Sequence, residues 1–330
     1  MPRIRVFRIW FALFLFLFLS PAAMLCAQPA VRGRLMEAGK LSLRQGNYEQ
    51  AKDVFRAAVA LSKELPGDSR VQGLHYLGIA YYRLGEYLEA ERAFKEGLLI
   101  AERLWGAEDR AVLQLKNHLG TVYVYMGRYT RAEKVFRHVA EIERDRTKPD
   151  LENLSGALNN LSQVLMTRRR HEEALAMQRE ALALREAAYG PEHREVATAL
   201  NNLSIQLRMT GMNGEAEKVQ LRALRILEKP LGPEHPELVW GLLNLARLYA
   251  SQRRFAEAEA LMERCRRICE LKLSPEHPIL GTVLMTHAEI LRETRRKRES
   301  EDLERRAKTI LRQHGEDNLL HHTIDVFAFQ

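Results

Sequence analysis

The chain has 330 residues, of which 46 % are hydrophobic and 28 % charged, and its formal net charge is +8 at pH 7. This is an ordinary globular composition, with enough apolar residues for a large core. The basic excess is modest and spread among many acidic residues, and three of its arginines fall in the first eight residues, so it gives little support to a nucleic-acid-binding protein.

The first 27 residues are predicted to be a signal peptide. A positively charged segment precedes an unbroken apolar run over residues 9–19, and Ala27 is a small residue suited to cleavage before Gln28. The apolar run is about half of the ~20 residues that a membrane-spanning helix needs. We therefore expect export, to a periplasm or out of the cell, with an uncleaved N-terminal anchor as the alternative. Lipidation of Cys26 is a minor option, because Leu25 is too large for the position before a lipidated cysteine.

Beyond this leader, residues 31–313 carry a repeat with a period of 42 residues. The landmark positions are Tyr87, Tyr129, His171, Asn213, Phe255 and Lys297, and Tyr48 precedes the first of them by 39 residues. A small residue follows each landmark by three positions, and another precedes it by nine. A fixed period of this size indicates a repeat array, in which each unit buries its apolar face against its neighbours.

Each unit is predicted to consist of a helix A, a tight turn, a helix B and a link. The seven units are approximately residues 31–66, 70–107, 110–149, 151–192, 194–234, 236–276 and 278–313. In four units a glycine stands two residues before the landmark, where a helix must stop and the chain reverse. Arg169, Arg253 and Arg295 replace this glycine in other units, which should strain the turn. From Pro66 onward, every proline is predicted to lie between units or at the end of one, so that none interrupts a helix.

The small residues are predicted to mark the contact between helix A and helix B of one unit. Leu158, Leu161 and Leu165 form the apolar face of one helix A, and Ser162 interrupts that face with a small side chain. Without bulk at Ser162 and at Ala174 on helix B, the two helix axes can approach to the short end of the usual ~8–10 Å range. Leucine at Ala174 should therefore overpack the contact.

Two consecutive units carry the same set of residues and resemble a known family. The first set is Leu77, Gly78, Tyr81, Gly85, Tyr87, Ala90 and Phe94, and the second is Leu119, Gly120, Tyr123, Gly127, Tyr129, Ala132 and Phe136. This spacing resembles the tetratricopeptide repeat (TPR) consensus and decides against HEAT repeats, which have a similar period. The long unit, with its Gly-Pro-Glu-His links at residues 190–193 and 232–235, is similar to the kinesin light chain type of repeat.

The resemblance implies an all-α fold, a right-handed superhelical solenoid of about seven TPR-like helix-turn-helix repeats. Lys297, Ser300 and Glu304 depart from the repeat pattern and make the last unit a polar terminal cap. Residues 314–330 are predicted to be a separate C-terminal tail.

The histidines of the links, His193, His235 and His277, invite a metal-site or catalytic interpretation because each follows a glutamate. Equivalent positions of stacked repeats, however, are separated by about 8–10 Å, whereas zinc ligands at about 2.1 Å from the metal must nearly touch. We expect the links to shape the start of the next helix. The sequence has none of the short motifs of hydrolases or nucleotide-binding enzymes. It therefore predicts no enzyme, no cofactor and no metal.

Two cysteines remain after the leader, Cys265 and Cys269. Their spacing of four residues on a predicted helix puts the Cβ atoms about 5–6 Å apart, whereas a disulfide requires about 3.8 Å. Cys265 aligns with an alanine in four other units, so we expect a small packed core residue.

The outward side of helix A is the predicted binding surface, because in TPR arrays this side lines the concave groove. In one unit it comprises Gly156, Asn159, Asn160, Gln163 and Thr167. Asparagines recur at two of these positions in neighbouring units, and an amide both donates and accepts hydrogen bonds, so such ladders could bind the backbone of an extended peptide. The alternative is that these amides bond to the adjoining helix. The candidate residues are Asn117, Tyr125, Asn159, Asn160, Gln163, Asn201, Asn202, Arg208, Trp240, Asn244 and Arg247.

The family's clamp for C-terminal carboxylates uses lysines on this side, and here Gln114, Gly156 and Thr198 occupy the first clamp position, which argues against a chaperone tail as ligand. The sequence thus favours an exported scaffold that grips an extended segment of a partner protein. One alternative is a membrane-anchored assembly factor whose repeats self-associate. A metal-dependent hydrolase that uses the His-Glu links is a second, and nucleic-acid binding ranks last.

Overall fold

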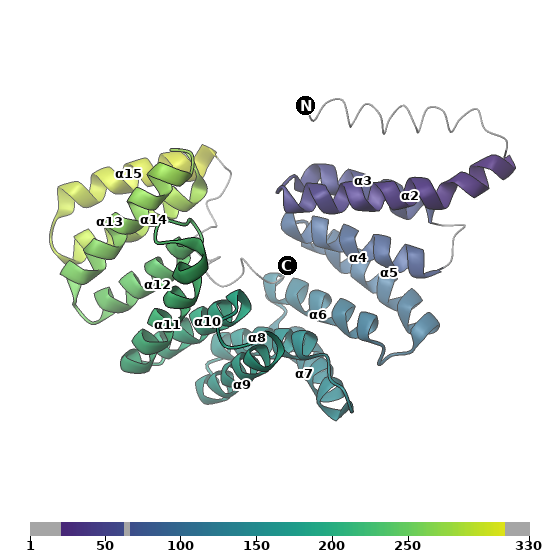
Figure 1. The fold of residues 1–330 in the computed structure, drawn as a ribbon, viewed down its shortest axis with the longest axis horizontal. Coiled ribbons are helices and arrows are strands. Elements are labelled where there is room, and N and C mark those ends of the chain that lie inside the picture. The colour runs from purple at the N-terminus through teal and green to yellow at the C-terminus, as the bar shows by residue number, and fades with distance from the viewer. Residues whose placement is uncertain (1–20, 63–66, 314–330) are drawn as a thin grey trace. The chain divides into compact units, whose positions relative to one another are not determined.

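The computed structural model describes residues 21–62 and 67–313. These residues form helices and no strands, as the repeat predicted (Figure 1). The fourteen helices make seven successive pairs: α2 (Pro21–Arg44) and α3 (Tyr48–Leu61), α4 (Gly67–Arg83) and α5 (Tyr87–Trp105), α6 (Arg110–Tyr125) and α7 (Tyr129–Asp145), α8 (Leu151–Thr167) and α9 (His171–Tyr189), α10 (Arg194–Met209) and α11 (Asn213–Leu231), α12 (Leu238–Ser251) and α13 (Phe255–Lys272), and α14 (Pro278–Glu293) and α15 (Lys297–Gln313).

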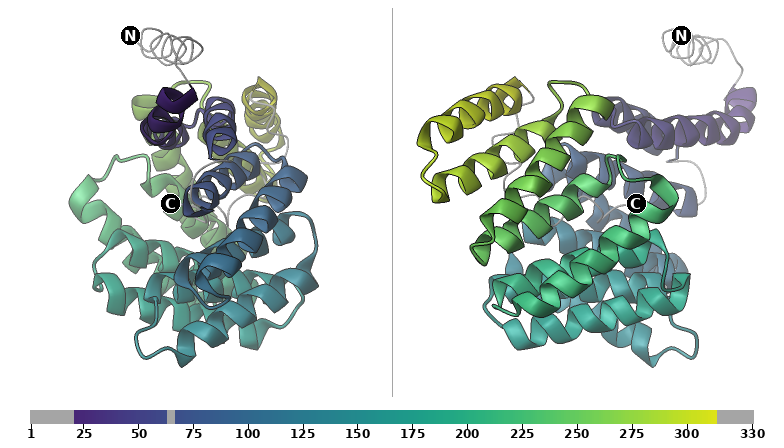
Figure 2. Two further views of the ribbon diagram at one scale, coloured as in Figure 1. Left: turned by 90° about the vertical axis from the view of Figure 1, so that its right-hand side faces the viewer. Right: turned by 60° about the vertical axis from the view of Figure 1, so that its left-hand side comes forward.

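The chain divides into two compact units, and the division falls between Val135 and Phe136, within α7. In the second unit the two helices of a repeat lie side by side, as the green to yellow pairs from α12 to α15 show (Figure 2). α2 begins at Pro21 and so contains the last residues of the predicted leader. The rest of the leader and the predicted tail lie outside the described residues.

The turn between the two helices of a repeat needs a residue in the left-handed region. Gly46, Gly85, Gly127 and Gly211 have φ between 68° and 80°. In the repeat of α8 and α9, Arg169 adopts φ 61°, and the Arg170 N–H donates to the Leu165 carbonyl at 2.9 Å. This bond, which runs from the residue after the left-handed one back to the last helical turn, is the Schellman arrangement. Arginine therefore keeps the turn that glycine forms, at the cost of a strained backbone.

Glycine at these arginine positions should stabilise the protein. Arg253 has φ 62° and an exposed side chain, so Arg253→Gly removes the left-handed strain and should raise the free energy of unfolding by up to about 1 kcal/mol. Thermal unfolding would show this as a higher Tm. Gly211→Arg, at φ 80° in the preceding repeat, should have the opposite effect. Equal melting temperatures for both variants and the parent would refute the strain.

Small residues bring helix A and helix B together, as the sequence predicted. In the first unit, a Cβ added to Gly78 would lie 2.6 Å from the Phe94 ring. In the second, Ala174 is fully buried, and the Ser162 hydroxyl donates to the Ala174 carbonyl at 2.8 Å. Ser204 donates to the Ala216 carbonyl in the same way, at 3.0 Å. Serine thus replaces glycine here because its hydroxyl satisfies a carbonyl at the point of closest approach.

One prediction about proline is wrong. Pro230 lies inside α11, although near its end. Pro29, which the prediction did not cover, also lies inside a helix, α2. Pro230 is the penultimate residue of α11, so its missing N–H removes only one hydrogen bond of the last turn. Pro278 is the first residue of α14, where the missing N–H has no helical acceptor in any case.

In the second unit, the A helices lie closer together than the B helices. α10 contacts α12, and α12 contacts α14. The B helices of consecutive repeats are instead bridged by long Arg–Glu pairs, such as Arg179 with Glu215 at 3.0 Å and Arg222 with Glu186 at 2.6 Å. Closer spacing on one side curves a stack of repeats toward that side. We call it the A-helix face: the side of α8, α10, α12 and α14 that carries Gly156, Thr198 and Trp240. The opposite side is the B-helix face.

Candidate functional site

The predicted asparagine ladders are joined to each other in the second unit. The Asn202 Nδ2 donates to the Asn159 Oδ1 at 2.8 Å, and the Asn244 Nδ2 donates to the Asn201 Oδ1 at 2.9 Å. Each bond runs from one repeat to the next, between residues that are 43 positions apart. The structure thus shows the alternative, in which the amides bond to the adjoining helix. Each bond holds consecutive A helices in register.

The same geometry recurs in the first unit with histidines. His75 on α4 and His118 on α6 are also 43 positions apart, and their Nε2 and Nδ1 atoms lie 2.8 Å from each other. Their rings stack with centroids 4.7 Å apart, and the Phe94 ring packs against both. Sequence analysis missed this pair, because its two members occupy neighbouring, not equivalent, positions of the repeat. Asn117, on the same helix as His118, is buried.

Buried glutamines reinforce the amide network. Gln178 and Gln220 stand where the first repeats have Phe94 and Phe136, and both are fully buried. The Gln220 Nε2 donates to the Asn201 Oδ1 and to the Gly241 carbonyl, each at 3.1 Å. Asn201 therefore accepts from two neighbours, and alanine in its place would leave two amide donors unsatisfied. Asn201 therefore stabilises the packing of its neighbours in addition to lying on the predicted binding surface.

Three other predicted site residues, Tyr125, Asn160 and Gln163, differ in the contacts that their side chains make. Tyr125 packs between Tyr82 and Tyr87, with ring centroids 5.1 and 5.3 Å away. The Asn159 Nδ2 also contacts the Asn160 Oδ1, at 3.3 Å. The buried Gln163 Nε2 has no hydrogen-bond partner among the described residues.

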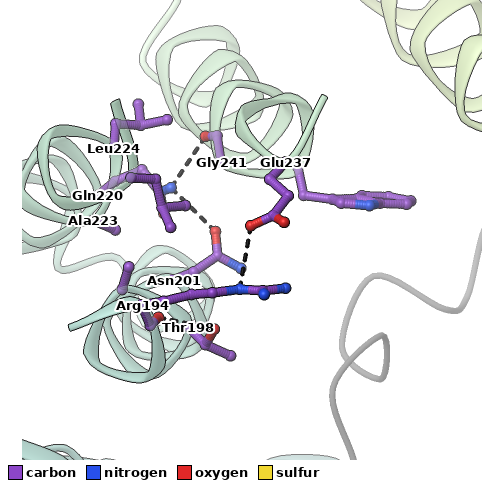
Figure 3. A pocket seen from close by; sticks show the side chains of 11 residues that line it. Arg194, Thr198, Asn201, Gln220, Ala223, Leu224, Glu237 and Gly241 are labelled. Atoms are coloured by element: carbon purple, nitrogen blue, oxygen red, sulfur yellow. Dashed lines mark hydrogen bonds and ion pairs between the residues drawn. The ribbon is translucent and has the colours of Figure 1, made fainter. Parts of the chain in front are cut away.

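A pocket lies between α10, α11 and α12, and it is lined by Arg194, Ala197, Thr198, Asn201, Gln220, Ala223, Leu224, Leu227, Glu237, Trp240 and Gly241 (Figure 3). Helix α11 can pack so close to α12 because Gly241 lacks a Cβ, which would lie 2.8 Å from the Leu224 Cδ2. The Arg194 Nε lies 3.2 Å from a Glu237 carboxylate oxygen and joins α10 to the start of α12.

Among the residues that line this pocket, Trp240 differs in type from its equivalents in the neighbouring repeats. Thr198 and Thr282 occupy the equivalent positions of the neighbouring repeats. The indole is partly exposed and packs against the core of the second unit. The Trp240 indole and the smaller Thr198 side chain both line the pocket, from two consecutive A helices. Trp240 and Asn201 are thus the two predicted site residues that line this pocket.

Arg208 and Arg247 extend this surface along α10 and α12. Both side chains are half-buried, and within the described residues neither has a carboxylate oxygen within 4.0 Å. The Arg247 Nη2 donates to the Thr286 Oγ1 at 3.0 Å. Burial lowers the pKa of both guanidiniums. For Arg247, the negative charge of Glu289 opposes this lowering of the pKa, and the positive charge of Arg208 adds to it.

Sequence comparison identifies the family. The profile of the tetratricopeptide repeat family matches residues 69–145, 153–229, 205–270 and 237–313, and a second tetratricopeptide repeat profile matches residues 35–65. The chain belongs to the tetratricopeptide repeat family. No protein of curated function matches the sequence of this TPR protein.

Solved structures share the TPR fold at low sequence identity. BtubC (BKLC) from P. vanneervenii is 20% identical, with a TM-score of 0.57, over 68% of this chain and 91% of its own. The nearly identical TPR-like repeats of a kinesin light chain from Podosopora anserina are 20% identical to this chain, with a TM-score of 0.52, over 62% and 97%. The Rap conjugation gene regulator of plasmid pLS20, in complex with the Phr* peptide, is 18% identical, with a TM-score of 0.58, over 84% and 73%.

The link histidines of the TPR protein have a structural role, as the sequence predicted. His193 and His277 are the N-cap residues of α10 and α14, and their Nδ1 atoms accept the backbone N–H of Glu195 and Ile279, each at 3.2 Å. The His235 Nδ1 accepts the Glu237 N–H at 3.3 Å in the same way. Each ring thus satisfies an N–H at the start of a helix that has no helical acceptor.

The remaining reactive residues of the repeats are buried. Cys265 and Cys269 are free and inaccessible, and burial raises the pKa of the Cys269 thiol to about 12 and that of Cys265 further. No group of three or more His, Cys, Asp or Glu side chains in the described part of the chain is placed to hold a metal ion. Within residues 21–62 and 67–313, no helix has both the length and the apolar character that crossing a bilayer requires.

Proposed function

We propose that this TPR protein is an interaction scaffold that binds an extended segment of a partner protein on the A-helix face of its second unit. The pocket beside Trp240 carries this proposal. It combines a partly exposed aromatic wall, an apolar floor of Ala223 and Leu224, and polar groups at Thr198 and Asn201. A concave surface with apolar walls and a few polar groups is the usual form of a binding site, and tryptophan is enriched among the residues that dominate interface energies.

The two faces of the second unit differ in a way that supports this choice. On the B-helix face, arginines and glutamates of neighbouring repeats already pair with each other, as Arg144 does with Glu180 and Arg179 with Glu215. Such exposed pairs contribute little to stability individually, but they leave few charges to recognise a partner. Similar TPR structures include a Rap protein in complex with Competence and Sporulation Factor and another in complex with the Phr* peptide. We extend peptide binding from these folds to the present chain as part of the proposal.

Replacing residues on each face in turn tests the scaffold. A partner isolated from the native host by affinity capture should no longer bind the double variant Trp240→Ala with Gly156→Trp, because the pocket wall is lost and a bulky ring obstructs the surface at a position with open space around it. The matched control is Leu221→Ala with Leu271→Ala, which changes two exposed residues on the B-helix face. Undiminished capture by the first variant, or loss of capture in the second alone, would place the binding surface elsewhere.

We further propose that the scaffold is exported. The charged and apolar segments of residues 1–19 and the small residue Ala27 support a cleaved leader. N-terminal sequencing of the protein purified from its host should give Gln28 as the first residue. A chain that still begins at residue 1 and sediments with membranes would favour the anchored assembly factor instead.

A further inference from the structure

We propose that Arg208 and Arg247 together form a binding site for a side-chain carboxylate of an acidic partner segment. This inference rests on the proposed choice of the A-helix face as the binding surface. It adds the chemical class of the ligand, which neither the fold nor the pocket beside Trp240 defines.

The first argument is that these two charges lack counter-charges where comparable arginines have them. The other half-buried arginines that the structure describes in the second unit each pair with a glutamate; they are Arg137, Arg146, Arg185, Arg222, Arg254, Arg264 and Arg266. Removing a guanidinium from water without a counter-charge is costly. A bound anion would recover that cost, so the site favours an anion more than an exposed arginine would.

The second argument is that the two guanidiniums come from adjacent helices and are partly held in place. Arg208 is in the last turn of α10, and Arg247 is on α12, which contacts α10. The Thr286 hydroxyl, itself buried, accepts from Arg247 at 3.0 Å. A side chain fixed in this way loses less conformational freedom when a ligand binds. Glu289 on α14 is the nearby acid, and it lies beyond ion-pair distance from Arg247 and is exposed.

The third argument concerns the form of the ligand. Guanidinium groups present several N–H donors in one plane and bind carboxylates through paired hydrogen bonds. Arg247 is seven residues beyond Trp240 on the same helix, which corresponds to about 10 Å along the axis. An extended chain covers that distance with about three residues. The geometry thus fits a segment whose acidic residue lies about three positions from the residue beside the pocket.

Fluorescence anisotropy of labelled peptides tests the site on the full chain. The probe is a twelve-residue peptide of alternating glycine and glutamate, and its glutamine counterpart is the neutral reference. Arg208→Gln with Arg247→Gln should weaken binding of the glutamate peptide at least tenfold. The matched control is Arg225→Gln with Arg267→Gln, two exposed arginines on B helices. It removes the same net charge and should change the affinity less than twofold.

Three outcomes would decide against the carboxylate site, and a fourth would decide against the scaffold surface alone. Equal loss in both double variants would mean that net charge alone attracts the peptide. Equal binding of the glutamine peptide would mean that no carboxylate is recognised, and competition by free glutarate at the same carboxylate concentration would make the ligand a small molecule. The double arginine variant could lose affinity for the glutamate peptide while the variant with Trp240→Ala still captures the host partner. This combination would retain the carboxylate site and reject the proposed scaffold surface.

Discussion

Replacing Ala174 by leucine should lower the free energy of unfolding by about 1–3 kcal/mol, because the larger side chain overpacks the contact between α8 and α9. Ala174 has no exposed surface, and its carbonyl accepts the Ser162 hydroxyl at 2.8 Å. The helices must separate to admit three more carbon atoms, which also breaks this hydrogen bond. Since each repeat contacts only its neighbours, the loss should spread through the second unit and appear as a lower Tm.

Ala183→Leu is the matched control for this prediction. Ala183 lies on the same helix α9 but is exposed, so leucine there meets no neighbouring helix. Its unfolding free energy should stay within about 0.5 kcal/mol of the parent. Indistinguishable urea unfolding curves for Ala174→Leu and Ala183→Leu would refute the close contact between the two helices.

The stability of the first unit should fall as the pH drops below about 6.5, because His75 and His118 must stay neutral in the fold. Burial lowers the pKa of His75 from 6.5 to about 4, and burial together with the neighbouring His75 lowers the pKa of His118. Between these pH values the unfolded chain binds protons that the folded chain does not. The free energy of unfolding therefore decreases as the pH falls, by about 1 kcal/mol per pH unit for each histidine. Above pH 6.5 this effect disappears.

The double variant His75→Asn with His118→Asn separates this effect from other titrations. It installs in the first unit the amide pair that Asn159 and Asn202 form in the second. The difference in Tm between the variant and the parent should shift in favour of the variant from pH 7 to pH 5. A difference that is independent of pH would contradict the neutral histidine pair.

The repeat architecture could be predicted because its determinants lie at a fixed period. Gly78 and Ala90, or Ser162 and Ala174, are recognisable as a pair of small residues in every unit, and each such pair acts within one repeat. The turns between the helices could be predicted for the same reason, including those in which an arginine replaces glycine at φ 61–62°. Steric requirements of this kind leave few alternatives at each position, so residue type indicates structure.

The binding surface could be predicted only in part, because its polar groups interact across repeats. The sequence places Asn159 and Asn201 in one ladder, but the bonds run to Asn202 and Asn244, which belong to the other ladder. An offset of 43 in place of 42 depends on how consecutive helices are staggered, and no single repeat encodes it. Similarly, nothing near Arg247 in the sequence shows that its guanidinium has no carboxylate as an ion-pair partner, because that depends on which side chains the adjacent helices present.

Site-specific photo-crosslinking in the native host tests the central claim most directly, namely that the A-helix face of the second unit holds the partner. A photoreactive phenylalanine analogue is placed at Gly156 or Trp240 on that face and, for comparison, at the exposed Leu221 or Leu271 on the B-helix face. We predict one crosslinked partner from both positions of the A-helix face and none from the other two. Crosslinks to the same partner only from Leu221 and Leu271 would contradict the proposed function.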